Sequence, residues 1–201
     1  MRGSLIILGF FALGILLGVN GSLPADLLTS NISFYVLCLL MFCVGITIGN
    51  DTNILKSLRN LNPAFASLPL MTILGTLMGS CVACLILSSV KLTDCLAIGS
   101  GMGYYSLSSI FITEYRGAEL GTTALLANII REIIALLGAP LMARYFGKLA
   151  PISVAGATSM DTTLPIITRY SGQPYVIVSI YHGALCDFSV PFLVTFFCSL
   201  S

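Results

Sequence analysis

The sequence has very few charged residues. Asp, Glu, Lys and Arg make up 8% of the 201 residues, against roughly 25% in an ordinary soluble protein. With 57% hydrophobic residues and a mean hydropathy of +1.00, the chain has too few polar side chains to cover a soluble globule of this size. The scarcity of charge therefore excludes the soluble classes and indicates an integral membrane protein.

Histidine, runs of like charge and catalytic motifs are also scarce. The formal net charge is +1 and no long basic or acidic run occurs, so nucleic acid is not an expected partner. His182 is the only histidine, which argues against a Cys/His metal site. Because no nucleophile–base pair is visible either, we predict a protein that is not an enzyme and holds no cofactor or metal.

The seven cysteines do not indicate disulfides. All fall within or at the edges of apolar runs, where cysteine usually acts as a small hydrophobic side chain. Cys81 and Cys84 have redox-motif spacing, but no thioredoxin-like βαβ pattern surrounds them. We therefore expect the cysteines to pack inside a membrane domain.

Apolar residues fill seven runs bounded by Gly, Pro or charges, roughly 4–19, 32–48, 64–90, 95–113, 118–144, 152–168 and 175–200. About twenty apolar residues cross a bilayer as a helix. The pattern predicts an all-α polytopic membrane protein with about seven transmembrane helices, forming one transport domain over residues 1–201. We expect residues 1–93 to act as a scaffold and residues 94–201 to carry the functional motifs.

Loop cations give the orientation, because cytoplasmic loops carry an excess of Lys and Arg. With the N-terminus inside, the cytoplasmic cations are Arg2, Lys56, Arg59, Arg116 and Arg169, and the outer ones are Lys91, Arg144 and Lys148. Seven crossings then place the C-terminus outside. The first run also resembles a secretory signal peptide, but a retained first helix is preferred because everything after it spans the membrane.

Two of the expected crossings contain helix-breaking residues. The fourth includes GSGMGYYS at 99–106, and the sixth includes GATSMDTTLP at 156–165. Glycine, hydroxyl residues and proline weaken a helix, and the freed backbone groups cannot face lipid. We predict two discontinuous helices in an inverted-repeat, secondary-transporter-like fold, in which half-helix ends supply partial charges near the midplane.

The glycine run is open to two interpretations. Gly101 and Gly103, followed by Tyr104, either allow close helix packing or form a backbone ligand site in a broken helix. The spacing and the absence of a preceding strand argue against a nucleotide loop.

Glu132 is a carboxylate near the middle of the apolar run 118–144. A charge at that depth costs at least ~3 kcal/mol, so it needs a partner, water or a bound cation. Asn128 lies four residues earlier on the same helical face, and Arg131 lies about 100° away. We expect Asn128 to hydrogen-bond the carboxylate and Arg131 to neutralise it in part. The group either locks the helices together or holds a proton or a cationic substrate group.

Two further acids lie in apolar segments. Asp161 has Thr158, Ser159, Thr162 and Thr163 beside it, and it either caps the next half-helix or faces a cavity near Glu132 with the hydroxyls as extra ligands. Asp187 lies five residues after His182. A contact between those two side chains would shuttle protons or satisfy two buried polar groups.

The motifs resemble those of the lysine exporter (LysO) family of bacterial inner-membrane proteins. The matching features are GxGMGYYS at 99–106, NIIRE at 128–132, GATSMDTTLP at 156–165, and His182-Gly183 followed by Pro191. The resemblance covers the chain from about residue 95 and implies export of L-lysine and of toxic analogues such as thialysine. It also implies that Glu132 and Asp161 are the functional intramembrane acids.

Family members usually approach three hundred residues, with about a hundred more at the N-terminus. The resemblance therefore implies that this chain is the larger, C-terminal part and has a small membrane partner carrying the missing helices. The expected mechanism is secondary transport coupled to a proton or Na⁺. Two alternatives remain: a cation/proton antiporter, and an accessory structural subunit of a membrane complex.

Overall fold

The structure, a computed structural model, describes residues 63–87 and 90–200 and seven helical positions nearer the N-terminus: Leu13, Leu16, Leu17, Tyr35, Leu39, Phe42 and Ile46. The crossings expected at 4–19 and 32–48 lie almost wholly outside the described residues. The chain divides into two compact units, Met1–Val44 and Gly45–Ser201. All features below belong to the second unit, and the boundary expected at residue 93 stays a prediction.

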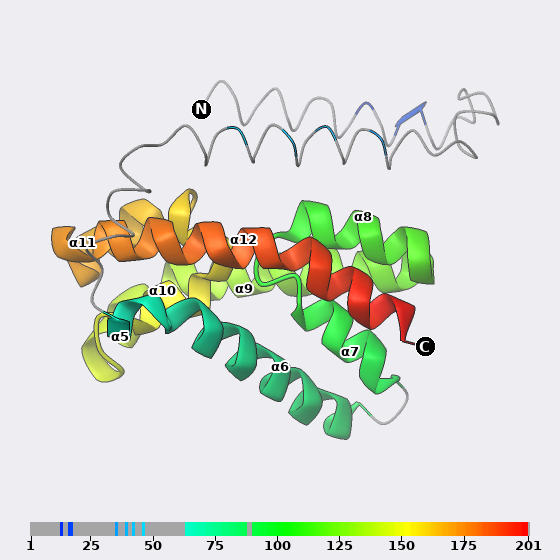
Figure 1. Cartoon of the computed structure of the whole chain (residues 1–201), viewed down its shortest axis with the longest axis horizontal. Helices are drawn as coiled ribbons and strands as arrows, with labels where there is room; N and C mark the ends of the chain where they lie inside the picture. Colours follow the sequence, from blue (N-terminus) through cyan, green and yellow to red (C-terminus); the bar gives the residue numbers. More distant parts are fainter. Residues whose placement is uncertain are drawn as a thin grey trace. The chain divides into compact units, whose positions relative to one another are not determined.

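Within 63–87 and 90–200 the regular elements are all helices (Figure 1). They are α5 (Pro63–Ala66), α6 (Leu68–Ile86), α7 (Leu92–Gly99), α8 (Tyr105–Arg116), α9 (Ala118–Tyr145), α10 (Ala150–Ala155), the 3-10 helix η1 (Gly156–Met160), α11 (Leu164–Ser171), the 3-10 helix η2 (Gln173–Tyr175) and α12 (Val176–Ser199). α12 contacts η1, α7 and α8, while α9 packs against α8 and α10. The all-α class is confirmed.

In the part of the chain that the structure describes, three helices are long and apolar enough to cross a membrane: Leu68–Ile86, Ala118–Tyr145 and Gln173–Ser199. They correspond to the crossings expected at 64–90, 118–144 and 175–200. α9 exposes large side chains and buries small ones; the large ones include Leu126, Ile130, Leu137 and Leu141, and the small ones Gly121, Ala124, Ala135 and Ala139. Small residues allow close helix packing in lipid while large apolar ones face the acyl chains. The chain is therefore a helical membrane protein.

The fourth and sixth expected crossings consist of shorter helices. α7 ends at Gly99, and a turn of residues 100–104 precedes α8, with left-handed backbone at Met102 (φ 44°) and Gly103 (φ 93°). α10 ends at Ala155, and η1 and the irregular residues 161–163 precede α11. The α-helix stops where the small and hydroxyl residues gather, because these residues favour turns over helix.

Candidate functional site

The 100–104 turn and the start of η1 touch through their backbones. The amide nitrogen of Ala157 donates to the carbonyl oxygen of Met102 at 2.9 Å. Gly156 has a φ of 66°, and a Cβ there would collide with the Met102 carbonyl. A Cβ on Gly103 would lie 2.9 Å from the carbonyl oxygen of Ala155. The glycines therefore let two segments that lie fifty residues apart in the sequence meet without intervening side chains.

Asn128 of α9 holds the 100–104 turn in place. It is 3% exposed, and its Oδ1 accepts a hydrogen bond from the Gly103 amide at 2.8 Å. Its Nδ2 donates to the carbonyl oxygens of Ala124, at 2.9 Å, and Ile98, at 3.3 Å. Both amide hydrogens are thus engaged by the backbone, and the expectation that Asn128 hydrogen-bonds Glu132 is wrong. Gly101 packs against the Asn128 side chain, where a Cβ would not fit.

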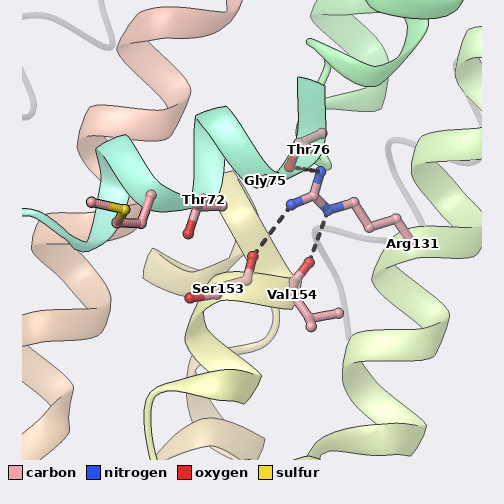
Figure 2. A pocket seen from close by; sticks show the side chains of 7 residues that line it. Thr72, Gly75, Thr76, Arg131, Ser153 and Val154 are labelled. Carbon is pink, nitrogen blue, oxygen red and sulfur yellow. Dashed lines mark hydrogen bonds between the residues drawn. The ribbon is translucent and has the colours of Figure 1, made fainter. Parts of the chain in front are cut away.

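Arg131 binds the end of α10 (Figure 2). Its Nε donates to the Val154 carbonyl at 2.8 Å, and an Nη donates to the Ser153 carbonyl at 3.3 Å. The other Nη lies 3.4 Å from Oγ1 of Thr76 on α6. A cation is stabilised at this position because the last carbonyls of a helix lack intrahelical partners and carry partial negative charge.

Arg131 and Glu132 do not pair. Within the described residues the structure contains an Arg116–Asp94 ion pair, at 3.8 Å, but none between these two neighbours. Glu132 is half-buried and forms no hydrogen bond with the described residues. Consecutive helical residues point about 100° apart, and Arg131 has turned to α10. The expectation that Arg131 partly neutralises Glu132 through a direct ion pair is therefore wrong.

The guanidinium of Arg131 forms part of the wall of a pocket of about 370 Å³ (Figure 2). The pocket lies between α6, α9 and α10 and is lined by Met71, Thr72, Gly75, Thr76, Arg131, Ser153 and Val154. Of the five N–H donors of an arginine, the three bonds above engage three. The other two N–H groups of Arg131 have no hydrogen-bond partner among the described residues.

Asp161 lies in the irregular residues between η1 and α11. It is exposed, and its Oδ1 accepts a hydrogen bond from the Thr162 amide. The side chain of Tyr105, at the start of α8, lies within electrostatic range of both Glu132 and Asp161. Asp161 does not cap α11: the N-cap is Thr163, and no side chain caps the helix there. Of the two interpretations of Asp161, the capping one is therefore wrong.

Most of the hydroxyl groups beside Asp161 are bound to neighbouring backbone. Thr158 donates to Ala155 at 3.0 Å. Ser159 and Ser179 of α12 each approach the other's carbonyl oxygen, at 3.0 and 2.7 Å. Thr162 is exposed. Of the expected hydroxyl ligands, Thr158 and Ser159 thus hold η1 in place through hydrogen bonds to backbone. Only Thr162 is exposed.

His182 links three elements. It is fully buried, its Nε2 lies 2.9 Å from Oγ1 of Thr72, and its Nδ1 lies 3.1 Å from Oγ of Ser159. No hydrogen bond joins it to Asp187 among the described residues, because five helical positions turn the two side chains about 140° apart. The expected contact between His182 and Asp187 is wrong. Asp187 and Asp161 both lie within electrostatic range of Tyr104, whose side chain is half-buried.

Sequence reasoning missed Thr72, Thr76 and Ser179. The first two lie on α6, which was expected to be only scaffold, yet they contact His182 and Arg131. Hydroxyl residues recur in this apolar helix at positions 72, 76 and 80, every four residues. That stripe on one helical face is the signal that could have found them.

Comparison with known proteins gives a consistent result. Residues 8–198 match the family described as Lysine exporter LysO. The chain is similar to the lysine exporter LysO of Escherichia coli K12, with 34% identity over 194 residues, which cover 96% of this chain and 64% of that protein. It is also similar to a putative lysine exporter of Haemophilus influenzae, with 35% identity over 167 residues. These residues cover 83% of this chain and 84% of that protein. The chain therefore spans less than two thirds of the E. coli protein's length. No solved structure matches.

Proposed function

The chain belongs to the lysine exporter LysO family, and on this premise we propose that it exports L-lysine and analogues such as thialysine across the bacterial inner membrane. We propose a secondary transporter, with its N-terminus in the cytoplasm. The relatives it resembles are named lysine exporter and putative lysine exporter.

The main support for a substrate site at Glu132 is that Arg131 and Glu132 do not form an ion pair. An arginine and a glutamate that served only to hold helices together would be expected to pair, since an unpaired charge in a membrane is costly. Instead Arg131 is held by the carbonyls of α10, and Glu132 has no partner among the described residues. The carboxylate is thus left for a cationic ligand, which favours a transporter over an accessory structural subunit.

The chemistry of lysine fits these groups. At neutral pH lysine carries two ammonium groups and one carboxylate. Glu132 and Asp161, which both lie within electrostatic range of Tyr105, would receive the ammonium groups. The two free N–H groups of Arg131, in the pocket beside Thr72 and Thr76, would receive the carboxylate, as guanidinium groups commonly do.

The two interrupted segments also support transport. We propose that α7–α8 and α10–η1–α11 are discontinuous membrane helices whose irregular backbone is tolerated because it is buried in protein or, at the exposed residues Asp161 and Thr162, lines a water-filled cavity. Irregular backbone of this kind at the midplane is typical of secondary-transporter sites. The inverted repeat remains part of the proposal. So does a small membrane partner, since the chain covers 64% of the E. coli relative.

The test is thialysine resistance in a bacterium that lacks its own lysine exporter, expressing this chain alone or with a candidate partner. We expect resistance with the wild-type chain and its loss with Glu132→Gln, at equal amounts of protein in the membrane. Glu119→Gln is the matched control, because Glu119 is exposed in the first turn of the same helix.

Each outcome has a defined meaning. Resistance that needs co-expression identifies the chain as one part of a two-chain transporter. Unchanged export by Glu132→Gln would refute the site. If the protein inserts into the membrane and never gives thialysine resistance, but catalyses Na⁺/H⁺ exchange in vesicles, the chain is a cation/proton antiporter and not a lysine exporter.

A further inference from the structure

Asp187 is a buried carboxylate without a partner among residues 63–87 and 90–200. It lies in the middle of α12 and is 3% exposed. The other buried polar side chains of this helix with titratable or hydroxyl groups are bound: Ser179 donates to Ser159, and His182 contacts Thr72 and Ser159. No hydrogen bond or ion pair to Asp187 occurs in the described part of the chain. The carboxyl group therefore needs another source of stabilisation.

Asp187 lies on the face of α12 that contacts η1. Gly183, one turn earlier on that face, packs so closely that a Cβ would lie 2.6 Å from the Met160 amide nitrogen and 2.9 Å from the Ala157 carbonyl oxygen. Asp161 follows Met160 directly and lies within electrostatic range of Asp187. The two acids thus lie near one another at the end of η1.

Among the described residues, the groups that lie within electrostatic range of Asp187 are Asp161, Tyr104 and Cys186, and none of them is a cation. Tyr104 lies in the 100–104 turn directly before α8, and Asp161 directly follows η1. On α12 itself, His182 is bound to Thr72 and Ser159, and Cys186 is a buried thiol. The segments α6 and α10 contain no charged residue, and the acid of α7, Asp94, pairs with Arg116.

The charged form of Asp187 is unfavourable in this position. Burial of an unpaired ionised group is strongly unfavourable, and the like charge of Asp161 adds to the penalty. A bound metal cation would need several oxygen ligands, and no group of three or more His, Cys, Asp or Glu in the described residues could hold a metal ion. A single proton satisfies the carboxyl group without further ligands.

We propose that Asp187 is the coupling-proton site of the exporter: it carries a proton while Asp161 has no cationic partner, and releases it when a lysine ammonium group binds at Asp161. In the release step the O–H bond of Asp187 breaks, the electron pair stays on the carboxylate, and the proton passes to water at exposed Asp161. The positive charge of the lysine ammonium group at Asp161 then takes the place of the positive charge of the proton that left Asp187. Outside, loss of lysine reverses the step. This inference rests on the proposed lysine export.

The experiment uses the purified chain, with its partner if resistance needs one, in liposomes. Two activities are compared: exchange of labelled for unlabelled lysine, which needs no net proton movement, and lysine accumulation driven by an imposed pH gradient. For Asp187→Asn we expect exchange to persist within about twofold and pH-driven accumulation to fall about tenfold or more, a typical coupling range. Glu114→Gln, at an exposed acid on α8, should retain both.

The outcomes separate this inference from the proposed function. Wild-type protein without lysine exchange would remove the proposed function, and this inference with it. Exchange by wild-type protein combined with pH-driven accumulation by Asp187→Asn would overturn the inference alone. Loss of both activities in a folded Asp187→Asn protein would also overturn the inference, because Asp187 would then belong to the substrate site. Lysine accumulation driven by a Na⁺ gradient would overturn it as well.

A second measurement does not depend on a variant. Dicyclohexylcarbodiimide modifies protonated carboxyl groups in apolar surroundings, and peptide mass spectrometry locates the adduct. We expect wild-type protein to be modified at Asp187 and excess lysine to slow the modification several-fold. Modification that lysine leaves unchanged, or its absence from Asp187, would refute the proposed site.

Discussion

The Nε atom of Arg131 donates to the carbonyl oxygen of Val154 at 2.8 Å. This bond joins the middle of α9 to the last turn of α10, and a second one to Ser153 makes the contact two-pronged. The planar guanidinium group is suited to such a contact, whereas the lysine ammonium is a compact point charge. The cation is thus a fixed part of the protein and also borders the pocket.

Replacing Arg131 with Lys should therefore destabilise the protein. Loss of one charged hydrogen bond to the α10 carbonyls costs about 1.5–3 kcal/mol. We expect a lower midpoint of thermal unfolding in detergent and reduced lysine export. Arg144→Lys, at an exposed residue at the end of α9, is the control and should change neither. Equal midpoints for the two variants would show that the contact with α10 contributes no stability.

The contact between the two interrupted segments can be tested with a pair of glycines. Gly156 and Gly147 both have positive φ, but only Gly156 has a backbone atom where a Cβ would lie. Gly147→Ala should cost about 1 kcal/mol from backbone strain alone. Gly156→Ala should cost at least about 1 kcal/mol more, since the Met102 carbonyl must move. Thermal unfolding measures the difference, and similar losses would contradict the close approach.

The link between His182 and Thr72 predicts a third result. Thr72→Val keeps the shape but removes the hydroxyl that meets Nε2 of a fully buried imidazole. An unsatisfied buried polar group costs about 1–3 kcal/mol, so we expect a lower unfolding midpoint. Thr123→Val is the control, because this exposed hydroxyl bonds only its own helix, at the Glu119 carbonyl. A Thr72→Val protein as stable as the control would indicate that the link is not needed.

The reciprocal contact of Ser159 and Ser179 predicts coupling between two substitutions. Each serine approaches the other's backbone, at 3.0 and 2.7 Å. Single changes to Ala should each cost about 0.5–1.5 kcal/mol. In the double variant the losses should fall short of their sum by at least about 0.5 kcal/mol. Unfolding measurements on the four proteins test this, and strictly additive losses would exclude direct coupling.

Sequence reasoning located the long helices because the property that defines them is local. A run of about twenty apolar residues is enough to identify α6, α9 and α12. The ends of α7 and α10 follow from glycine and hydroxyl residues that weaken helices wherever they occur. These features need no knowledge of what packs against what.

The partners of the polar residues were harder to predict. Proximity in sequence suggested that Arg131 binds Glu132 and that His182 binds Asp187. The actual partners come from α10, α6 and η1, and their approach depends on tertiary packing that no local pattern encodes. The backbone bond between Ala157 and Met102 has no side-chain signature apart from the neighbouring glycines.

The size pattern on α9 also limits how this sequence can change over evolution. The inward positions 124, 135 and 139 hold alanines with at most 2% exposure, so any larger side chain there must push neighbouring helices apart. The outward leucines and isoleucines meet fluid lipid, where one aliphatic residue serves as well as another. Drift should therefore exchange the large residues freely and spare the small ones, the reverse of the tolerance found around a water-soluble core.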